Sequence, residues 1–482
     1  MSPDPTVCYQ ALLARDARFD GRFFAGVVTT GIFCRPICPA PKPRRKNVRF
    51  YTSAAAAADA GFRPCLRCRP EASPGSPGWL GTEAVVHRAM RLIAEGALDS
   101  KGMERFADGL GVGSRHLRRL FQRHVGASPI SVAKTRRVLF AKKLIDDTDL
   151  PMSDVALSAG FASIRRFNAA VRETYARSPT ELRALARKRS KPIGGKGLTI
   201  TLAVRPPFDW GALVGFLGPR AIPGVEAVGR DAYRRTFRVG STHGVIRVAP
   251  VPGRNELSMS VRLGESRGLI DVVERARRLF DLDADPSAIH EHLHADARLR
   301  RLVDRSPGLR VPGAWDPAEL AVRAVLGQQV TVSGATTLAG RLARAFGEPL
   351  AIDAGHGLDV VFPRPADLAD ADLSRIGLPR ARQETVRSVA RACCNGSLER
   401  IPSSLEELVE GWTGVPGVGA WTAHYIAMRA FREPDAFPAS DLGLRKTLSR
   451  RGRVPTPREL LEIAEPWRPW RAYAAMHLWN TL

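Results

Sequence analysis

Four short stretches of the chain alternate between apolar and polar residues, whereas most of the remaining sequence has apolar residues at helical spacing. The alternating stretches are 198–204, 233–239, 244–248 and 257–263. Because successive side chains of a strand point to opposite faces, this alternation predicts a small antiparallel sheet with one or two helices. From about residue 284 onward the spacing is helical, which predicts an all-α region framed by residues 317–346.

Two further stretches repeat one helical plan. Residues 103–121 and 153–167 each contain an apolar helix, a turn marked by glycine and a basic second helix. This order is typical of helix-turn-helix units, whose second helix lies in the major groove of DNA. A basic helical bundle with solvated arginines is the alternative. The residues that can reach phosphates or base edges are Arg115, His116, Arg118, Arg119, Arg165 and Arg166.

Composition narrows the choice of partner. The 482 residues favour about three domains. Lysine and arginine outnumber the acidic residues by 73 to 48, so the net charge is +25 and the pI is near 10.8. This excess favours a polyanion such as double-stranded DNA. No apolar run reaches ~18 residues and the N-terminal residues lack a secretory signal pattern, so we expect a cytoplasmic monomer with no membrane partner.

Four of the seven cysteines form two short pairs, Cys34 with Cys38 and Cys65 with Cys68. Two such pairs separated by a strand-and-helix stretch can converge tetrahedrally on one Zn²⁺ ion. Disulfides are the alternative, and a reducing compartment disfavours them. Four thiolates around Zn²⁺ carry a net charge of about −2, which leaves their sulfurs nucleophilic toward a soft alkyl donor.

A glycine turn joins two helical stretches near the C-terminal end. Gly417 and Gly419 lie between residues 405–412 and 420–431, which predicts a helix-hairpin-helix. The glycines let backbone N–H groups approach a DNA phosphate, and the second helix adds the positive end of its dipole. An ordinary helix connection is the alternative, because one Gly-x-Gly turn is a weak signal.

Aromatic residues and a carboxylate follow this turn. Trp421 and Tyr425 share a helix face at i, i+4, and Asp441 comes after a loop that contains proline. Aromatic walls with one acid predict a pocket for a nucleobase.

Proline, glycine and charge dominate residues 72–78 and 187–197, which are expected to be linkers. The expected fold class is multidomain α+β. It comprises a small four-cysteine zinc domain, an all-α double helix-turn-helix domain, a small antiparallel α+β subdomain and an all-α helix-hairpin-helix domain. Their expected ranges are 1–75, 82–186, 198–283 and 284–482.

From about residue 198 to 482 the sequence resembles the AlkA-type 3-methyladenine DNA glycosylases of the helix-hairpin-helix superfamily. The resemblance rests on residues 205–210, 326–331, the hairpin, Asp441 and residues 466–479. It implies that Asp441 is catalytic and that the base pocket is lined by Phe216, Trp421, Tyr425 and Trp479. It also implies that Gln328 and Gln329 fill the space left by the flipped base, although such enzymes can carry an apolar wedge where this chain has Gln329.

The same resemblance implies a mechanism. An alkylated purine is cationic, so it stacks well on indole faces and leaves readily without a general acid. The sugar gains oxocarbenium character, which Asp441 can stabilise while it orients or deprotonates water. Bifunctional relatives carry a lysine where this chain has Trp421, so we expect a monofunctional hydrolase that needs no cofactor.

The cysteine-containing stretches resemble the N-terminal domain of Ada-type alkylation-response regulators. The matching residues are 29–36 and 60–65. The resemblance implies that Cys34 takes a methyl group stoichiometrically from a DNA methylphosphotriester, and that Cys38, Cys65 and Cys68 complete the ligation of one zinc. A purely structural zinc ribbon is the alternative.

Residues 159–167 and 178–183 resemble the AraC-type DNA-binding domain, the second module of Ada-type regulators. Together the resemblances indicate a fusion of an Ada-type regulator with an AlkA-type glycosylase. We therefore expect excision of alkylated bases combined with methylphosphotriester sensing and transcriptional activation, with alkylated and promoter DNA and RNA polymerase as partners. The alternative is a regulator whose glycosylase-like half binds DNA but is inactive.

A histidine motif, His290-Glu-His-Leu-His294, has the spacing of a metal-binding helix. The sequence indicates no matching distant ligand, so a solvated helix is the favoured interpretation.

Overall fold

The computed structural model describes residues 4–70, 84–94, 96–100, 102–187, 198–240, 242–263, 268–395, 404–449 and 452–481. The expected linkers at 72–78 and 187–197 lie outside these residues, except for Arg187, which ends a helix. The chain divides into two compact units. The first is Met1–Pro206 with Val251–Glu274, and the second is Pro207–Pro250 with Arg275–Leu482.

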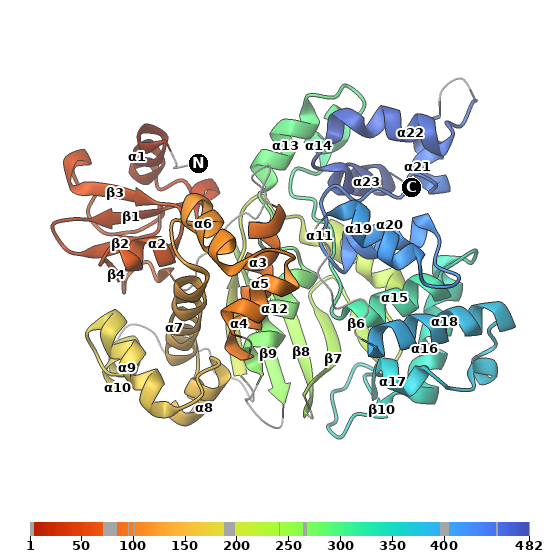
Figure 1. The fold of residues 1–482 in the computed structure, drawn as a ribbon, viewed down its shortest axis with the longest axis horizontal. Coiled ribbons are helices and arrows are strands. Elements are labelled where there is room, and N and C mark those ends of the chain that lie inside the picture. The colour runs from red at the N-terminus through yellow and green to blue at the C-terminus, as the bar shows by residue number, and fades with distance from the viewer. Residues whose placement is uncertain are drawn as a thin grey trace. The chain divides into compact units, whose positions relative to one another are not determined.

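The first unit begins with a small sheet whose register brings the cysteine pairs together. Its strands, drawn in red in Figure 1, have the order β3-β1-β2-β4 and are β1 (Phe24–Val27), β2 (Ile32–Cys34), β3 (Val48–Tyr51) and β4 (Arg63–Pro64). Helices α1 (Pro5–Ala14) and α2 (Ala54–Asp59) contact the strands of this sheet. Phe33 of β2 lies opposite Pro64 of β4 in a parallel pair, so the next residues, Cys34 and Cys65, come together where these strands end.

Eight helices follow among the described residues of this unit, and they confirm the two helix-turn-helix units. The long helix α7 contacts α3, α8, α9 and α10. The second helices of the units, α6 and α9, bury Leu117 and Phe121, and Phe167 and Val171, respectively. These helices are α3 (Ala84–Ala94), α4 (Ala97–Ser100), α5 (Met103–Gly109), α6 (Ser114–His124), α7 (Pro129–Asp147), α8 (Met152–Ser158), α9 (Ile164–Tyr175) and α10 (Pro179–Arg187).

The predicted strands form within one or two residues of their expected bounds. In the first unit β5 (Leu198–Ala203) pairs antiparallel with β9 (Glu256–Leu263). In the second unit β7 (Tyr233–Val239) pairs antiparallel with β8 (Thr242–Pro250) and with the short strand β6 (Glu226–Val228). The sequence pattern missed β6 because three residues are too few to show alternation.

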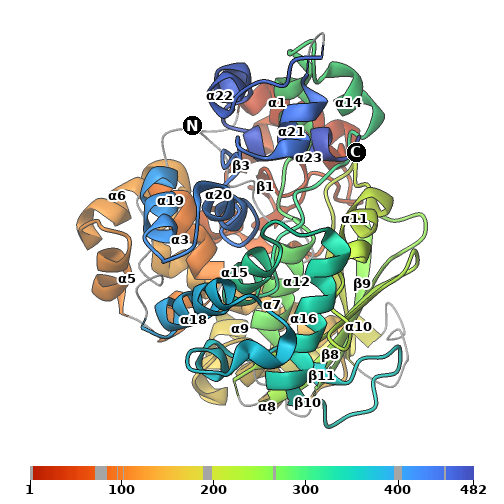
Figure 2. The same ribbon diagram turned by 90° about the vertical axis from the view of Figure 1, so that its right-hand side faces the viewer.

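The remainder of the second unit is mainly helical (Figure 2). The predicted helical stretch 317–346 consists of two helices separated by a short loop. This loop forms part of the site described below. The helices that matter here are α11 (Trp210–Leu217), α13 (Pro286–His294), α14 (Arg300–Arg305), α15 (Pro317–Leu326), α16 (Val332–Phe346), α18 (Arg380–Cys394), α19 (Leu405–Thr413), α20 (Ala420–Arg429), α21 (Leu442–Thr447) and α23 (Arg471–Trp479). Within the described residues, no helix is long and apolar enough to cross a membrane.

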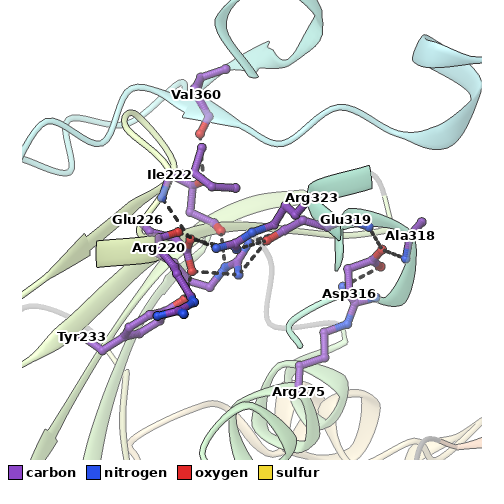
Figure 3. Close-up of polar contacts among 12 residues, drawn as sticks. Arg220, Ile222, Glu226, Tyr233, Arg275, Asp316, Ala318, Glu319, Arg323 and Val360 are labelled. Carbon is purple, nitrogen blue, oxygen red and sulfur yellow. Dashed lines mark hydrogen bonds and ion pairs between the residues drawn. The ribbon is translucent and has the colours of Figure 1, made fainter. Parts of the chain in front are cut away.

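Two buried ion pairs tie the strands of the second unit to α15. Arg235 of β7 contacts Glu319 of α15 at 2.7 Å, and both side chains are at least nine-tenths buried. Arg323 of α15 contacts Glu226 of β6 at 3.0 Å and Glu319 at 3.2 Å (Figure 3). Burial raises the pKa of Glu226, but the charges of Arg323 and Arg235 outweigh it, so the pKa lies below its ordinary value. Each buried charge is therefore compensated by its neighbours.

Replacing Glu319 by alanine is expected to destabilise the second unit by up to about 3–5 kcal/mol, because the buried Arg235 guanidinium loses its contact at 2.7 Å and keeps only Glu226 at 3.7 Å. Denaturant unfolding of this variant and of a control variant, each compared with the parent protein, measures the loss of stability. The matched control is Glu348→Ala, since Glu348 pairs with Arg238 at 2.8 Å but is 39% exposed. It should cost far less. Equal losses of stability from the two changes would contradict a structural role for the buried pairs.

Candidate functional site

The hairpin turn in the second unit can be built only with glycine at its tightest point. Gly417 has a φ of 83°, and a Cβ placed there would lie 2.0 Å from Thr385 Oγ1 of α18. Gly419 is the N-cap of α20, and a Cβ there would meet no atom within 4 Å. The first N–H groups of a helix have no partner within it. The turn therefore presents the amide-rich start of α20 to solvent, as phosphate binding requires.

The two glutamines predicted to act together have different environments. Both lie in the loop between α15 and α16. Gln328 donates from Nε2 to the Gly417 carbonyl at 3.1 Å and to Thr422 Oγ1 at 3.2 Å, so it joins this loop to the hairpin. Gln329 is exposed and has a φ of 56°. Gln328 is partly buried, so of the two only Gln329 is exposed.

A cavity of about 920 Å³ is lined by the predicted base-pocket residues of three helices, α11, α20 and α23, and by Asp441 just before α21. The rings of Trp421 and Tyr425 stack with centroids 5.1 Å apart and planes 9° from parallel. Trp479 meets Tyr425 edge to face at 6.4 Å. The lining includes Phe216, Trp421, Tyr425, Asp441 and Trp479.

Asp441 is held by three N–H groups. Its Oδ2 accepts from Trp421 Nε1 at 2.9 Å, and its Oδ1 accepts from Trp479 Nε1 at 3.0 Å. Oδ1 also accepts from the backbone N–H of Leu444 at 2.9 Å, so Asp441 caps the N-terminus of α21. Among the described residues, the contacts to the two oxygens come from N–H donors only. A carboxylate can accept all three hydrogen bonds, whereas an amide cannot.

Three arginines that the sequence did not single out line the same cavity: Arg220, Arg323 and Arg429. Arg429 donates to the Tyr425 hydroxyl at 2.6 Å, and the Arg220 guanidinium carbon lies 3.9 Å from the Phe216 ring centroid. Burial raises the pKa of Tyr425, but the charges of Arg429 and Arg220 outweigh it and lower the pKa overall. The sequence signals for this cluster are that Arg429 lies four residues after Tyr425 and Arg220 lies four residues after Phe216.

In the first unit, the four predicted cysteines converge and are buried. Their sulfurs all lie within 4.8 Å of one another, and those of Cys38 and Cys65 are 4.0 Å apart. Tetrahedral ligation with Zn–S bonds of about 2.3 Å requires sulfur separations of about 3.8 Å. Both the spacing and the donor type therefore fit one Zn²⁺ ion.

The sulfurs of the cluster differ in their hydrogen bonds. The backbone N–H of Arg35 donates to Cys68 and that of Arg67 donates to Cys65, at 3.3 and 3.4 Å. In the described part of the chain, no backbone N–H is seen to donate to the Cys34 sulfur. Hydrogen bonding within the cluster raises the pKa of Cys34 and lowers that of Cys38. A Zn²⁺ ion bound there would stabilise all four sulfurs as thiolates.

Arg35, which lies between Cys34 and Cys38 in the sequence, stabilises the cluster through buried hydrogen bonds. Its Nε donates to Asp20 Oδ1 at 2.9 Å and its Nη1 donates to the Cys68 carbonyl at 3.0 Å. The side chains of Arg35 and Asp20 are 10% and 5% exposed. This buried pair fixes the backbone between Cys34 and Cys38. The sequence did not reveal it because Asp20 lies fifteen residues earlier, outside the cysteine motif.

The candidate DNA-contacting arginines are all exposed on the second helices of the two helix-turn-helix units. Arg115, Arg118 and Arg119 lie on α6, and Arg165 and Arg166 lie on α9. The buried residues of these helices face inward, so the basic faces are available to a partner.

Four family models match the chain in order. The metal binding domain of Ada matches residues 7–71, and a helix-turn-helix domain matches residues 106–185. The AlkA N-terminal domain matches residues 199–316, and the HhH-GPD superfamily of base excision DNA repair proteins matches residues 322–469.

The chain is similar over its whole length to a protein of Mycobacterium tuberculosis named as a probable bifunctional transcriptional activator/DNA repair enzyme AlkA. The two are 45% identical, and the match covers 100% of this chain and 97% of the relative. DNA-3-methyladenine glycosylase 2 of Escherichia coli is 36% identical over 58% of this chain and 96% of its own length. The solved 3-methyladenine DNA glycosylase of Archaeoglobus fulgidus, at 22% identity and a TM-score of 0.52 over 58% of this chain and 98% of its own, shares the fold.

Proposed function

This chain belongs to the family of bifunctional Ada/AlkA-type transcriptional activators and DNA repair enzymes, and we propose that its second unit hydrolyses the glycosidic bond of 3-methyladenine-type bases in double-stranded DNA. The observation that carries this proposal is the Asp441 carboxylate, held between the indole N–H groups of Trp421 and Trp479 at an aromatic cavity. A flipped base needs aromatic faces, and the sugar that loses it needs a negative charge nearby.

The charges around the cavity favour departure of a cationic base. As the glycosidic bond breaks, positive charge moves from the base to the sugar. Arg220 and Arg429 line the cavity, and neither has a carboxylate within ion-pair distance among the described residues. Their charge disfavours a cation on the base, while Asp441 favours a cation on the sugar. Asp441 also orients or deprotonates the attacking water, and no cofactor enters this reaction.

Borohydride is expected to trap no covalent complex between this protein and DNA from which the base has been removed. A trapped adduct requires an amine that attacks the sugar, and the residue that follows the hairpin turn at the lysine position of bifunctional relatives is Trp421. Gel analysis after reduction measures the adduct, with a bifunctional glycosylase as the positive control. A borohydride-dependent adduct would contradict hydrolysis by a monofunctional enzyme.

For the first unit we propose that Cys34 senses methylphosphotriesters. The Cys34 sulfur bonds to the methyl carbon, the O–CH3 bond breaks, and the phosphate leaves as a diester anion. Zn²⁺ bound by the four cysteines would hold the Cys34 sulfur as a thiolate. Within the residues that the structure describes, no backbone N–H donates to the Cys34 sulfur, in contrast to Cys65 and Cys68. This difference supports Cys34 as the acceptor, because hydrogen bonds reduce the nucleophilicity of a sulfur.

Methylation would raise the charge of the cluster from about −2 to about −1. Removing one negative charge ~8 Å from a phosphate relieves roughly 0.5–2 kcal/mol of repulsion at an effective dielectric of about 20–80. This corresponds to a several-fold to about thirty-fold gain in DNA affinity at low salt. The gain in affinity would act on promoter DNA bound by the exposed arginines of α6 and α9. The protein would act as a cytoplasmic monomer, with RNA polymerase as its partner in activation.

Exposure to DNA that contains methylphosphotriesters is expected to add one methyl group per chain, on Cys34. Peptide mass spectrometry locates the methyl group, and promoter binding at low salt measures the gain in affinity. A Cys34→Ser variant, which lacks the acceptor sulfur, serves as the control. A methyl group on another cysteine, or unchanged affinity for every promoter tested, would contradict the proposed switch.

A further inference from the structure

A second group of potential metal ligands lies in the helical part of the second unit, far along the chain from the cysteines. His290 and His294 are one turn apart on α13, and Asp304 is on the neighbouring helix α14. Asp304 Oδ1 lies 3.6 Å from His290 Nε2 and 3.4 Å from His294 Nε2. The two imidazoles stack with centroids 5.4 Å apart. Asp304 thus supplies the distant ligand that the sequence did not reveal.

The three donor atoms have the spacing of one face of a metal coordination polyhedron. They all lie within 4.8 Å of one another. In a tetrahedral Zn²⁺ site with bonds of about 2.0–2.1 Å, neighbouring donor atoms are about 3.3 Å apart. The two distances to Asp304 Oδ1 are within a few tenths of an ångström of that value. Two imidazoles could pair with a carboxylate through any of their nitrogens, yet here both Nε2 atoms converge on a single oxygen.

The three side chains are partly exposed, and α14 packs against another helix of the second unit. The side chains of His290, His294 and Asp304 are 34%, 42% and 51% exposed, so water can complete the coordination. His290 Nδ1 is buried without a hydrogen-bond partner, as is Nδ1 of the buried His477 on α23, whose electrostatic environment includes His290. Helix α14 contacts α23, and the two lie together in both views (Figures 1 and 2).

We propose that His290, His294 and Asp304 bind one divalent transition-metal ion, with Zn²⁺ as the ion that fits the spacing. Imidazole and carboxylate donors favour Zn²⁺ over Mg²⁺ or Ca²⁺, which prefer oxygen ligands only. The site crosslinks α13 and α14. Helix α23, which contacts α14, also carries Trp479 of the base pocket, so the ion braces the packing behind one wall of that pocket. The site is independent of the four-cysteine cluster and of the proposed glycosylase activity.

Zinc titration of the full-length protein tests this site. The parent is expected to bind two Zn²⁺ ions per chain, one resistant to a weak chelator and one that the chelator removes. His294→Ala should abolish the second equivalent or weaken it at least about tenfold, because loss of a residue that only orients a ligand already costs about 10–100-fold. His292→Ala is the matched control, since His292 lies on the same helix but its Nε2 contacts the Pro466 carbonyl instead. This variant should keep both ions.

Asp304→Asn provides a second variant that preserves side-chain shape and should also lose the removable ion. Co²⁺ substitution distinguishes the two sites spectroscopically, because the removable ion should lack the thiolate-to-metal charge-transfer band of the cysteine cluster. A single equivalent in the parent, or retention of the second equivalent in folded His294→Ala and Asp304→Asn variants, would overturn the proposal. So would loss of that equivalent in His292→Ala.

Discussion

Replacing Asp441 by asparagine is expected to lower the rate of 3-methyladenine release by about 10²–10³-fold or more, while DNA binding stays within a few-fold of the parent. The substitution removes the negative charge that stabilises the sugar cation. It also disturbs the site, because Oδ1 accepts two N–H groups and Oδ2 accepts one. If the asparagine keeps its oxygen at the Oδ1 position, its NH2 group points toward the Trp421 N–H. Two hydrogen-bond donors then face each other, which is unfavourable.

Single-turnover base release from methylated duplex DNA measures this effect. The matched control is Glu410→Gln, which makes the same charge change at an exposed residue of α19, outside the cavity. It should excise bases at nearly the parental rate. If Asp441→Asn and Glu410→Gln show the same rate, Asp441 does not act on the reacting sugar.

Replacing Cys38 by alanine is expected to remove the tightly bound zinc and abolish methyl transfer, although Cys34 is still present. Structural zinc sites contribute about 10–16 kcal/mol of binding free energy, which is lost or greatly reduced when a thiolate ligand is removed. Base excision should stay within a few-fold of the parent, since Asp441 and the aromatic residues belong to the other compact unit. This variant therefore separates a ligand role from the acceptor role proposed for Cys34.

Metal analysis and transfer of a labelled methyl group measure these outcomes. Cys8→Ala is the matched control, because Cys8 is a buried cysteine of α1 outside the cluster, and burial raises its pKa to about 11. It should keep both zinc and methyl transfer. Retention of methyl transfer by zinc-free Cys38→Ala would contradict a requirement for the four-cysteine site.

Local patterns predicted the elements and the paired cysteines because both depend on neighbours in the sequence. The alternation that predicts a strand at 233–239 is also what places Tyr233 and Phe237 in the core. The spacing of Cys34 and Cys38 was readable for the same reason. The resemblance also placed Gln328 and Gln329 in a loop, and the structure has this loop between α15 and α16.

Contacts between distant elements were beyond the reach of these patterns. Arg220 contacts Phe216 four residues earlier in the chain, but its interaction with Tyr425 of α20 forms only in the folded protein. Similarly, Asp304 meets the histidines through the packing of α13 against α14, which a pattern within one helix cannot reveal. The resemblance to known glycosylases named the pocket aromatics, whereas the hydrogen bonds from two of them to Asp441 emerged only from the structure.

The most direct test of the proposed repair activity is the release of free base from methylated duplex DNA by the intact protein, with the Asp441→Asn variant measured in parallel. The parent is expected to release 3-methyladenine and leave an unbroken strand with an abasic site, while the variant releases essentially none. If the intact protein binds this DNA but releases no base, the second unit is a DNA-binding module of a regulator and the proposed glycosylase activity is wrong.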